Sequence, residues 1–406
     1  MQLVAYGAQD IYLTGNPQIT FFKVVYRRHT NFSMESIQQT WAGTFSQSTG
    51  AGRCTATIAR NGDLVNRLYI EFDKSVFNPS TSPSGSGIFS DTGLNNGPAQ
   101  WINTVECEIG GQTIDRQTGA WMEAWAELTE PDAVIAEGRS RFQNMSSMGG
   151  AFGGIRVSNN NIYVPLRFWF CENPGLALPL IALQYHEVKI IVDAQQPYPL
   201  DLNGATTNGD PQLWADYIYL DTDERRRFAQ VSHEYLITQI QYQDFSVSGS
   251  ANNQTCTLTF NHPVKELVWT GTFGPNASES TNNGLFTTLS SGAYQLKLNG
   301  HDRFAARDRN YFTRQQVWQY HSGPGGLTQQ TADPQPNDSI AVYSFALKPE
   351  EHQPSGTCNF SRIDNSQLLL NDTSPVSPTS AINTVYAVNY NVLRIMSGMG
   401  GLAYSN

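Results

Sequence analysis

The feature that most constrains this chain is a segment that occurs twice. Residues 55–69 read TATIARNGDLVNRLY, and residues 255–269 read TCTLTFNHPVKELVW. Residues of like type stand 200 positions apart (255 − 55 = 200) at five places: Thr55/Thr255, Thr57/Thr257, Ile58/Leu258, Asn61/Asn261 and Leu64/Val264. This period is too long for a solenoid or propeller repeat and is typical of a duplicated domain. The repeat therefore predicts two copies of one β domain.

Two further pairs of segments repeat in the same order. Residues 108–112 (EIGGQ) resemble residues 297–301 (KLNGH), 189 positions later (297 − 108 = 189). Residues 163–168 (YVPLRF) resemble residues 341–345 (AVYSF), 178 positions later (341 − 163 = 178). The offset shrinks along the chain, which is expected if the second copy has shorter loops.

Composition agrees with a strand-and-loop protein and argues against two functional classes. Only 15% of the residues are charged and 11% are aromatic. The net charge of −10 argues against direct contact with nucleic acid, which needs a basic surface to displace counterions. The longest apolar run, residues 176–183, contains Pro179 and is too short to cross a bilayer, and the N-terminus lacks a signal-peptide pattern. We therefore expect no transmembrane segment.

Alternating and apolar runs predict eight strands in the first copy. In the usual labels B to I, they are residues 33–41, 53–60, 64–72, 101–109, 112–115, 162–170, 185–193 and 214–221. Gly110-Gly111 predicts a tight hairpin between strands E and F, because glycine readily adopts positive φ. Long insertions fall between D and E (residues 74–100) and between F and G (residues 116–161), and the second includes a predicted helix over residues 120–128.

The second copy repeats this order. Its predicted strands are residues 234–245, 254–260, 264–270, 293–298, 301–304, 339–347, 367–370 and 384–396. Asn299-Gly300 takes the place of Gly110-Gly111, and Asn-Gly is a strong hairpin signal. Long polar loops again fall between D and E (residues 271–292) and between F and G (residues 305–338).

A tight E–F link with long D–E and F–G insertions is typical of a jelly roll. We therefore predict an all-β chain of two tandem eight-stranded jelly rolls with few short helices. Both insertions of a jelly roll leave at one end, so the four long loops are expected on one face. The predicted division is an N-terminal arm (residues 1–30), a first roll (residues 31–222) and a second roll (residues 223–406), with the boundary near the sequence DTDERRRF.

No residue pattern indicates catalysis, a cofactor or a metal. His186-Glu187 and His233-Glu234 lack the second histidine of HExxH, and no His-x-His pair occurs. The glycine-rich runs lack the Lys-Ser/Thr of a P-loop. The five cysteines are scattered singly, which is typical of reduced thiols. We therefore predict that the chain is not an enzyme.

Two groups of residues leave alternatives open. The run Arg225-Arg226-Arg227 could bind nucleic acid, but its acidic neighbours favour a linker in which the arginines pair with those acids or with a neighbouring subunit. The aromatic residues of the F–G insertions could stack on sugars, but aromatics of this kind more often bury against a neighbour; they are Trp121, Trp125, Trp318 and Tyr320.

Seven N-x-S/T sequons occur, and three of them fall in predicted loops. Without a secretory signal, such sequons are expected to arise by chance. If sugars are attached, the candidate glycosylation sites are Asn144, Asn276 and Asn337.

Long segments resemble the major capsid proteins of large icosahedral double-stranded-DNA viruses, particularly those that infect algae. The similar segments are residues 7–32, 60–64, 174–189, 216–230, 260–265, 298–307, 343–365 and 389–404. The sequence departs from the family in residues 75–97, 127–154 and 271–291, which are all predicted outer loops.

The resemblance implies a double jelly-roll subunit that forms a homotrimer, a pseudo-hexagonal capsomer of six rolls. It implies that neighbouring capsomers tile an icosahedral shell over an internal membrane, with the loops outward and the arm at the base near minor capsid proteins. It also implies a protein of the virion that is made and assembled in the host cytoplasm. Family members often carry covalent glycans added by virus-encoded enzymes, frequently outside standard sequons.

Two other classes of function have distinct expectations. A carbohydrate-binding double β-sandwich protein for surface attachment would have exposed aromatic platforms and bind glycans as a monomer. A jelly-roll enzyme would gather histidines or carboxylates in one pocket.

Overall fold

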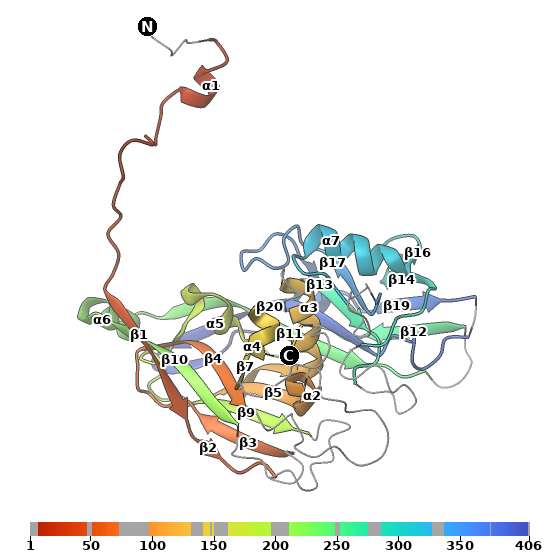
Figure 1. Ribbon diagram of the computed structural model, residues 1–406, viewed down its shortest axis with the longest axis horizontal. Helices are drawn as coiled ribbons and strands as arrows, with labels where there is room; N and C mark the ends of the chain where they lie inside the picture. The colour runs from red at the N-terminus through yellow and green to blue at the C-terminus, as the bar shows by residue number, and fades with distance from the viewer. Residues whose placement is uncertain are drawn as a thin grey trace.

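The computed structural model of the protein describes most of the chain. The described residues are 7–46, 51–72, 97–130, 141–146, 148–149, 161–195, 211–247, 252–274, 286–326, 337–373 and 375–404. Two β-sandwiches lie side by side, and an extended N-terminal segment leaves the first of them (Figure 1).

The first sandwich is a jelly roll. One sheet has the strand order β1-β10-β4-β7, which is B-I-D-G in the usual labels: β1 (Phe32–Gln39), β10 (Gln212–Leu220), β4 (Leu64–Phe72) and β7 (Ile162–Pro165). The facing sheet has the order C-H-E-F: β3 (Gly52–Thr57), β9 (Val188–Ala194), β5 (Ile102–Ile109) and β6 (Gln112–Thr118). Short strands β2 (Trp41–Ala42) and β8 (Leu178–Pro179) pair at the margins.

The second sandwich repeats the same topology. Its B-I-D-G sheet contains β11 (His233–Asp244), β20 (Thr384–Met396), β13 (Pro263–Thr270) and β17 (Ile340–Ser344). Its C-H-E-F sheet contains β12 (Asn253–Leu258), β19 (Ser366–Asn371), β14 (Ala293–Leu298) and β15 (His301–Asp302). Three short strands add to these sheets: β16 (Arg307–Asp308), β18 (Cys358–Asn359) and β21 (Met399–Leu402). The double jelly-roll prediction is confirmed, with short strands in addition to the eight-strand scheme.

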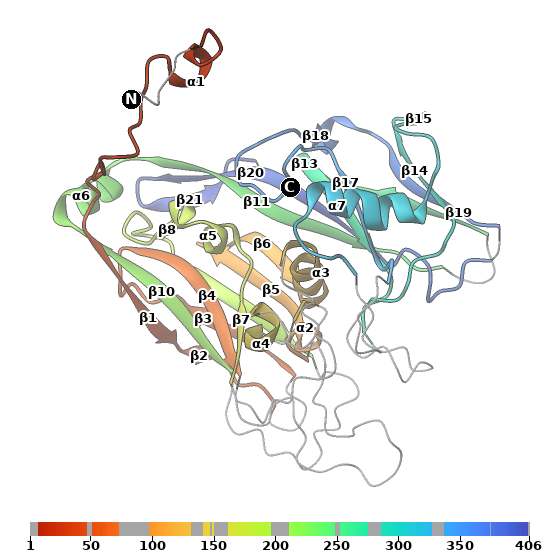
Figure 2. The same ribbon diagram turned by 45° about the horizontal axis from the view of Figure 1, so that its top comes forward.

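The helices of the described residues are short and lie in the connections. They are α1 (Ile11–Thr14), α2 (Gly97–Trp101), α3 (Gly119–Thr129), α4 (Arg141–Ser146), α5 (Trp169–Glu172), α6 (Thr222–Gln230) and α7 (Gln316–Tyr320). A π-helical turn, η2 (Tyr311–Gln315), leads into α7, and two 3-10 turns are η1 (Pro174–Leu176) and η3 (Phe360–Arg362). Figure 2 shows α3 where the two rolls meet.

The pairing of strand D with strand I shows that the predicted alignment of the two copies is wrong by one residue in strand D. In the first roll, Val65 pairs with Tyr217 beside a bulge, and in the second roll Val264 pairs with Asn389 beside a bulge. Val65 therefore corresponds to Val264, an offset of 199 (264 − 65 = 199) rather than the 200 that paired Leu64 with Val264. The connection between the aligned residues of strands C and D is one residue shorter in the second roll. The sequence comparison did not detect this difference.

Both E–F hairpins form at the predicted positions. Gly110 and Gly111 have φ of 59° and 86°, and Asn299 and Gly300 have φ of 51° and 77°. Two successive residues with positive φ match the twist of the flanking strands in a two-residue hairpin.

Two predicted segments differ in the structure. The predicted strand over residues 162–170 ends at Pro165, and α5 begins at Trp169. The N–H of Leu166 still donates to the carbonyl of Leu68 at 2.9 Å, and the chain then turns into α5. The predicted polar loop over residues 305–338 contains β16, η2 and α7, because Phe312 is buried in the core of the second roll and anchors the helical segment.

The connection between the rolls is helical. Asp221 caps α6 by accepting from the N–H of Thr222, at 2.7 Å. Acidic Asp223 and Glu224 in the first turn and Arg227 in the last turn suit the helix dipole. A helix is not predicted here from the sequence, because the residues of α6 show no apolar periodicity. In the structure, none of them is buried.

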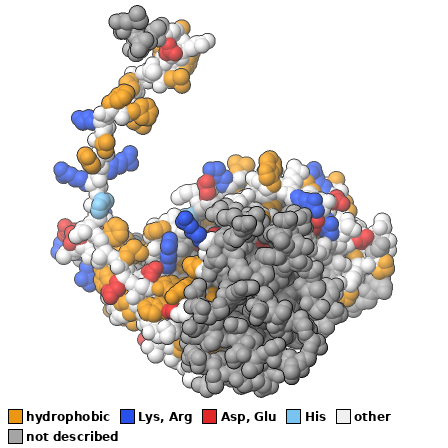
Figure 3. Space-filling model, viewed as in Figure 1, with side chains coloured by type: hydrophobic (Ala, Val, Ile, Leu, Met, Phe, Trp, Pro, Cys, Tyr) orange, Lys and Arg blue, Asp and Glu red, His pale blue; other side chains and the backbone are white. Residues whose placement is uncertain are grey.

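The N-terminal segment makes little contact with the body. The side chains of residues 11–31 are all exposed. Many of them are apolar, as the orange side chains along the extended segment in Figure 3 show: Ile11, Tyr12, Leu13, Ile19, Phe21, Phe22, Val24, Val25 and Tyr26. Exposed apolar surface of this extent is typical of segments that pack against a partner.

Candidate assembly surfaces

Helix α3 joins the two rolls. Thr118 caps it by accepting from the N–H of Trp121, at 3.1 Å. One face of α3 carries Met122 into the core of the first roll. The other face carries Trp121, Ala124 and Leu128 onto the B-I-D-G sheet of the second roll. The helix therefore packs at once on the core of the first roll and on the outward face of the second roll's sheet.

The contact beneath α3 is aromatic and buried. Trp121 is buried, with its ring centroid 5.0 Å from that of Tyr386 on β20 and 5.3 Å from that of Trp125. The rest of the cluster comes from outward positions of the second B-I-D-G sheet (Val268, Ile340, Val342 and Val388), from Val317 of α7 and from Phe286. This buried apolar area holds the two rolls in a fixed relation.

The edge strand β6 of the first roll makes polar contacts with β11 of the second. Gln239 donates from Nε2 to the carbonyl of Ile114, and the N–H of Ile240 donates to Asp115 Oδ1 at 3.2 Å. Burial raises the pKa of Asp115 to about 6, although hydrogen bonds from Gln117 and Ile240 oppose the rise. These bonds fix the register of one roll against the other.

A buried ionic cluster lies at the end of α7, beside α3. His321 Nε2 lies 3.0 Å from Glu266 Oε2, and His321 Nδ1 lies 3.1 Å from Glu350 Oε1. Burial opposes protonation of His321, but the two carboxylates outweigh it and raise the pKa of His321 to about 9. The edge of the imidazole meets the Trp125 ring at a centroid distance of 6.0 Å. The cluster thus connects the second roll to the helix of the first.

The backbone beyond His321 continues this connection. The N–H of Gly323 donates to the carbonyl of Leu128 at 2.7 Å, and the N–H of Gly325 donates to the carbonyl of Glu127 at 3.0 Å. Ser322 Oγ donates to the carbonyl of Thr129 at 2.8 Å. The last carbonyls of α3, which have no partner within the helix, are satisfied by the second roll.

The outward side of the B-I-D-G sheet of the first roll carries a different surface. Tyr69 on β4 stacks on Trp214 of β10 with ring centroids 6.4 Å apart and planes 8° apart. Tyr163 of β7 meets Tyr69 edge-on at 6.1 Å. Among the described residues, no helix of the second roll covers this sheet as α3 covers its counterpart.

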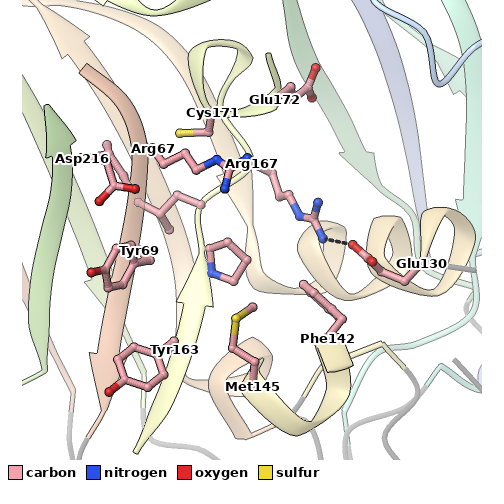
Figure 4. Close-up of a pocket in the computed structure, with 13 residues that line it drawn as sticks. Arg67, Tyr69, Glu130, Phe142, Met145, Tyr163, Arg167, Cys171, Glu172 and Asp216 are labelled. Carbon is pink, nitrogen blue, oxygen red and sulfur yellow. Dashed lines mark hydrogen bonds and ion pairs between the residues drawn. The ribbon is translucent and has the colours of Figure 1, made fainter. Parts of the chain in front are cut away.

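A cavity of about 480 Å³ lies on this surface (Figure 4). Arg167, at its edge, binds Glu130 at 2.8 Å and lies over the ring of Phe142. The lining mixes aromatic and apolar side chains with charged ones, including Arg67, Tyr69, Met145, Tyr163, Pro165, Glu172 and Asp216. The cavity is open to the surface and lies between β4, β7, α4 and α5.

The predicted aromatic residues of the F–G insertions do not form one platform. Trp121 is buried, and Trp125 and Tyr320 are half-buried. Trp318 on α7 is 81% exposed. The expectation that these residues bury against a neighbour holds for Trp121, whose neighbour is the second roll of the same chain.

Two arginines of α6 pair with acids, and one of these acids is a neighbour in the sequence, as the linker interpretation expects. Arg227 lies 3.7 Å from Glu224. Arg225 binds Asp63 at 3.0 Å, and Asp63 also accepts from the N–H of Leu220 at 2.9 Å. The sequence did not indicate Asp63, because it lies more than 150 positions away.

The three candidate glycosylation sites differ in their surroundings. Asn144 belongs to α4, but its side chain lies outside the described residues, as does all of Asn276. Asn337 is half-buried: its Nδ2 donates to the carbonyl of Phe286 at 3.1 Å, and its Oδ1 accepts from Thr288. Most of the predicted outer loops likewise lie outside the described residues, so their shared face stays a prediction.

The described residues contain neither a metal cluster nor a spanning helix. No three His, Cys, Asp or Glu side chains in these ranges gather as a metal site would require. Of the helices in the same ranges, none is long and apolar enough to cross a bilayer.

Comparison with known proteins decides the family. The sequence pattern described as "Major capsid protein N-terminus" matches residues 20–221, and that described as "Large eukaryotic DNA virus major capsid protein" matches residues 224–401. This chain belongs to the major capsid proteins of large eukaryotic DNA viruses. Its role is structural, in the capsid shell of the virion.

Individual relatives agree along the whole chain. The major capsid protein of Pyramimonas orientalis virus is 46% identical, and that of Paramecium bursaria Chlorella virus 1 is 41% identical. Each alignment covers 100% of this chain and 99% of the relative. A solved structure described as the PBCV-1 virus capsid is 36% identical, with a TM-score of 0.72, over 95% of this chain and 100% of the other. The family resemblance seen in the sequence is confirmed.

Proposed function

We propose that this capsid protein acts as a homotrimer, a pseudo-hexagonal capsomer of six jelly rolls. The observation that carries the proposal is the duplication: two rolls of the same topology are held rigidly side by side by α3 and the His321 cluster. Three such pairs around a threefold axis present six similar units, which suits a hexagonal lattice.

The chain divides by function into three parts in this proposal. Residues 1–30 are an arm, residues 31–222 the first roll and residues 223–406 the second roll. The exposure of residues 11–31 and the exposed helix α6 between the rolls support this division. Neither roll has a proposed catalytic role.

The solution mass of the purified protein tests the oligomer. Light scattering should give about 135 kDa, three times the 45.0 kDa of one subunit (3 × 45.0 = 135). A stable mass near 45 kDa would contradict the trimer and favour the alternative, a monomeric carbohydrate-binding protein, whose next test is binding to glycans.

The arm is proposed to connect capsomers to their surroundings, which include neighbouring capsomers and minor capsid proteins beneath the shell. Its exposed apolar side chains support this role, because they bury no area in the single subunit. The proposed site of synthesis and assembly is the host cytoplasm.

Deleting residues 1–22 should leave the trimer folded and abolish its joining into shells. The reason is that residues 11–22 contact nothing in the rolls, so their removal leaves both cores unchanged. Thermal unfolding and solution mass should match the intact protein, while electron microscopy of assembly reactions should show free capsomers. Unfolding of the truncated protein, or normal shells, would contradict this role.

Covalent glycans on the outer loops are a further part of the proposal, with Asn144, Asn276 and Asn337 as candidate attachment residues. A glycan on Asn337 would require its Nδ2 to release the carbonyl of Phe286. Mapping glycopeptides of protein from virions tests all three positions, and unmodified peptides at each would contradict them.

A further inference from the structure

The two rolls of one chain contact each other through two different surfaces: the F–G helix of the first roll and the outward B-I-D-G face of the second. Each roll has both kinds of surface, so one F–G helix and one outward face are not used in this contact. The first roll contributes α3 and β6, and the second contributes the outward face of β11-β20-β13-β17. Because the rolls share one topology, the second roll also has an F–G helix, η2–α7, and the first roll also has an outward B-I-D-G face. Within the described residues of one chain, these two surfaces do not meet.

The two sheet faces correspond residue by residue. Tyr69 and Val268 both lie four positions after the aligned pair Val65/Val264. Trp214 and Tyr386 both lie three positions before the aligned pair Tyr217/Asn389. Tyr163 corresponds to Ile340, because each pairs with the strand D residue six positions after Val65 or Val264. The residues under α3 therefore have aromatic counterparts on the outward B-I-D-G face of the first roll: Tyr69, Trp214 and Tyr163.

The two helical segments correspond as well. Counted from the last residues that pair with strand E, Thr118 of β6 and Asp308 of β16, the core residues Met122 and Phe312 both lie four positions on. Ten positions on lie Leu128 and Trp318. Leu128 is buried in the contact between the rolls, whereas Trp318 is 81% exposed.

The cavity on the uncovered face has the character that an indole needs. Its volume of about 480 Å³ exceeds that of one aromatic side chain, and Tyr69, Tyr163 and Met145 supply apolar contact. Carboxylates of Asp216 and Glu130 lie in the lining and can accept from the indole N–H. Aromatic side chains in such pockets dominate the binding energy of interfaces.

We propose that η2–α7 of one subunit packs on the outward face of β1-β10-β4-β7 of a second copy, with Trp318 in the cavity beside Tyr69 and Tyr163. This inference rests on the proposed trimer and names its interface. The contact reproduces between chains the contact that α3 makes within one chain. Repeated three times, it closes a ring, as a head-to-tail interface with a closing rotation must.

Two single substitutions, one on each side, test the interface. Trp318→Ala and Tyr163→Ala should each raise the dissociation constant of the trimer about 30-fold or more, the range of a central aromatic contact. Both side chains are exposed in the subunit, so the fold should be unchanged. The control is Leu347→Ala, which removes an apolar side chain that is 76% exposed and belongs to neither surface.

Sedimentation over a dilution series measures the effect, and a photo-crosslinker at position 318 locates the contact. Dissociation of both variants, with crosslinks to residues 67–69 or 163–167 of another copy, is the expected result. A trimeric parent protein whose variants dissociate no more than the control, or whose crosslinks fall elsewhere, would overturn the interface and leave the trimer standing. A parent protein that is monomeric at all concentrations would overturn both.

Discussion

Replacing Trp121 by alanine is expected to destabilise the subunit by about 3–5 kcal/mol, the range for removing a large aromatic side chain from a packed core. The indole is buried between the rolls, against Tyr386 and Trp125. Its loss leaves a cavity that α3 cannot close, because Met122 holds the opposite side of the helix in the first core. Unfolding in denaturant measures the change in the free energy of unfolding.

The same experiment on Tyr12→Ala provides the control, since Tyr12 lies in the exposed arm and its loss should change stability by less than about 0.5 kcal/mol. Trp121→Phe should fall between the two, because it keeps part of the aromatic packing. A Trp121→Ala protein as stable as the Tyr12→Ala protein would mean that α3 does not hold the rolls together.

Replacing His321 by alanine is expected to destabilise the subunit by about 3–5 kcal/mol near pH 6, because it leaves the buried carboxylate of Glu266 without its partner. The effect should depend on pH. The pKa of His321 is about 9 in the folded protein and near the ordinary 6.5 in the unfolded chain. The folded state thus binds the proton more tightly, and the stabilisation is complete below pH 6.5 and is lost as pH rises through 9.

The matched control is His301→Ala, since His301 is exposed on β15. The difference in unfolding free energy between the His321 variant and the intact protein should therefore shrink between pH 6.5 and 9.5, while the His301 variant follows the intact protein throughout. A difference that stays constant over this interval would show that His321 is neutral in the fold.

Local signals predicted the parts of the fold that depend on local chemistry. Gly110-Gly111 and Asn299-Gly300 located both hairpins, because few residue pairs accept positive φ twice. The long strand β20 has the predicted bounds of Thr384–Met396, because apolar residues dominate this stretch and Ser397-Gly398 follows it. Together with the repeat, these signals were enough for the double jelly roll.

The features that were not predicted have physical causes that are not visible in the sequence alone. Helix α6 has no apolar face, so its acidic start and basic end were interpreted as a linker. The helical segment η2–α7 is anchored by one core residue, Phe312, within a polar stretch. His321 and Glu266 are 55 positions apart and meet only in the fold, where the residue that follows α7 reaches Glu266 of β13.

The candidate assembly surfaces were predicted only in part. The sequence placed Trp121 and Trp318 in one group with Trp125 and Tyr320, yet Trp121 is buried inside the chain and Trp318 is exposed. The outward face at Tyr69 has one signal in the sequence, which is the alternation of side chains along β4. Arg67, Tyr69 and Glu71 are outward, and Leu68 and Ile70 between them are buried. Its pairing with Trp214 depends on register, which only the structure supplies.

Electron microscopy of the purified, unassembled protein tests the central claim most directly. Class averages viewed along the symmetry axis should show six lobes of similar size in a hexagonal outline, two from each of three subunits, with threefold symmetry. Averages with two lobes per particle would mean that the protein is a monomer. Three separated two-lobed arms would mean that the contact between chains does not repeat the contact between rolls. Either result would contradict the account.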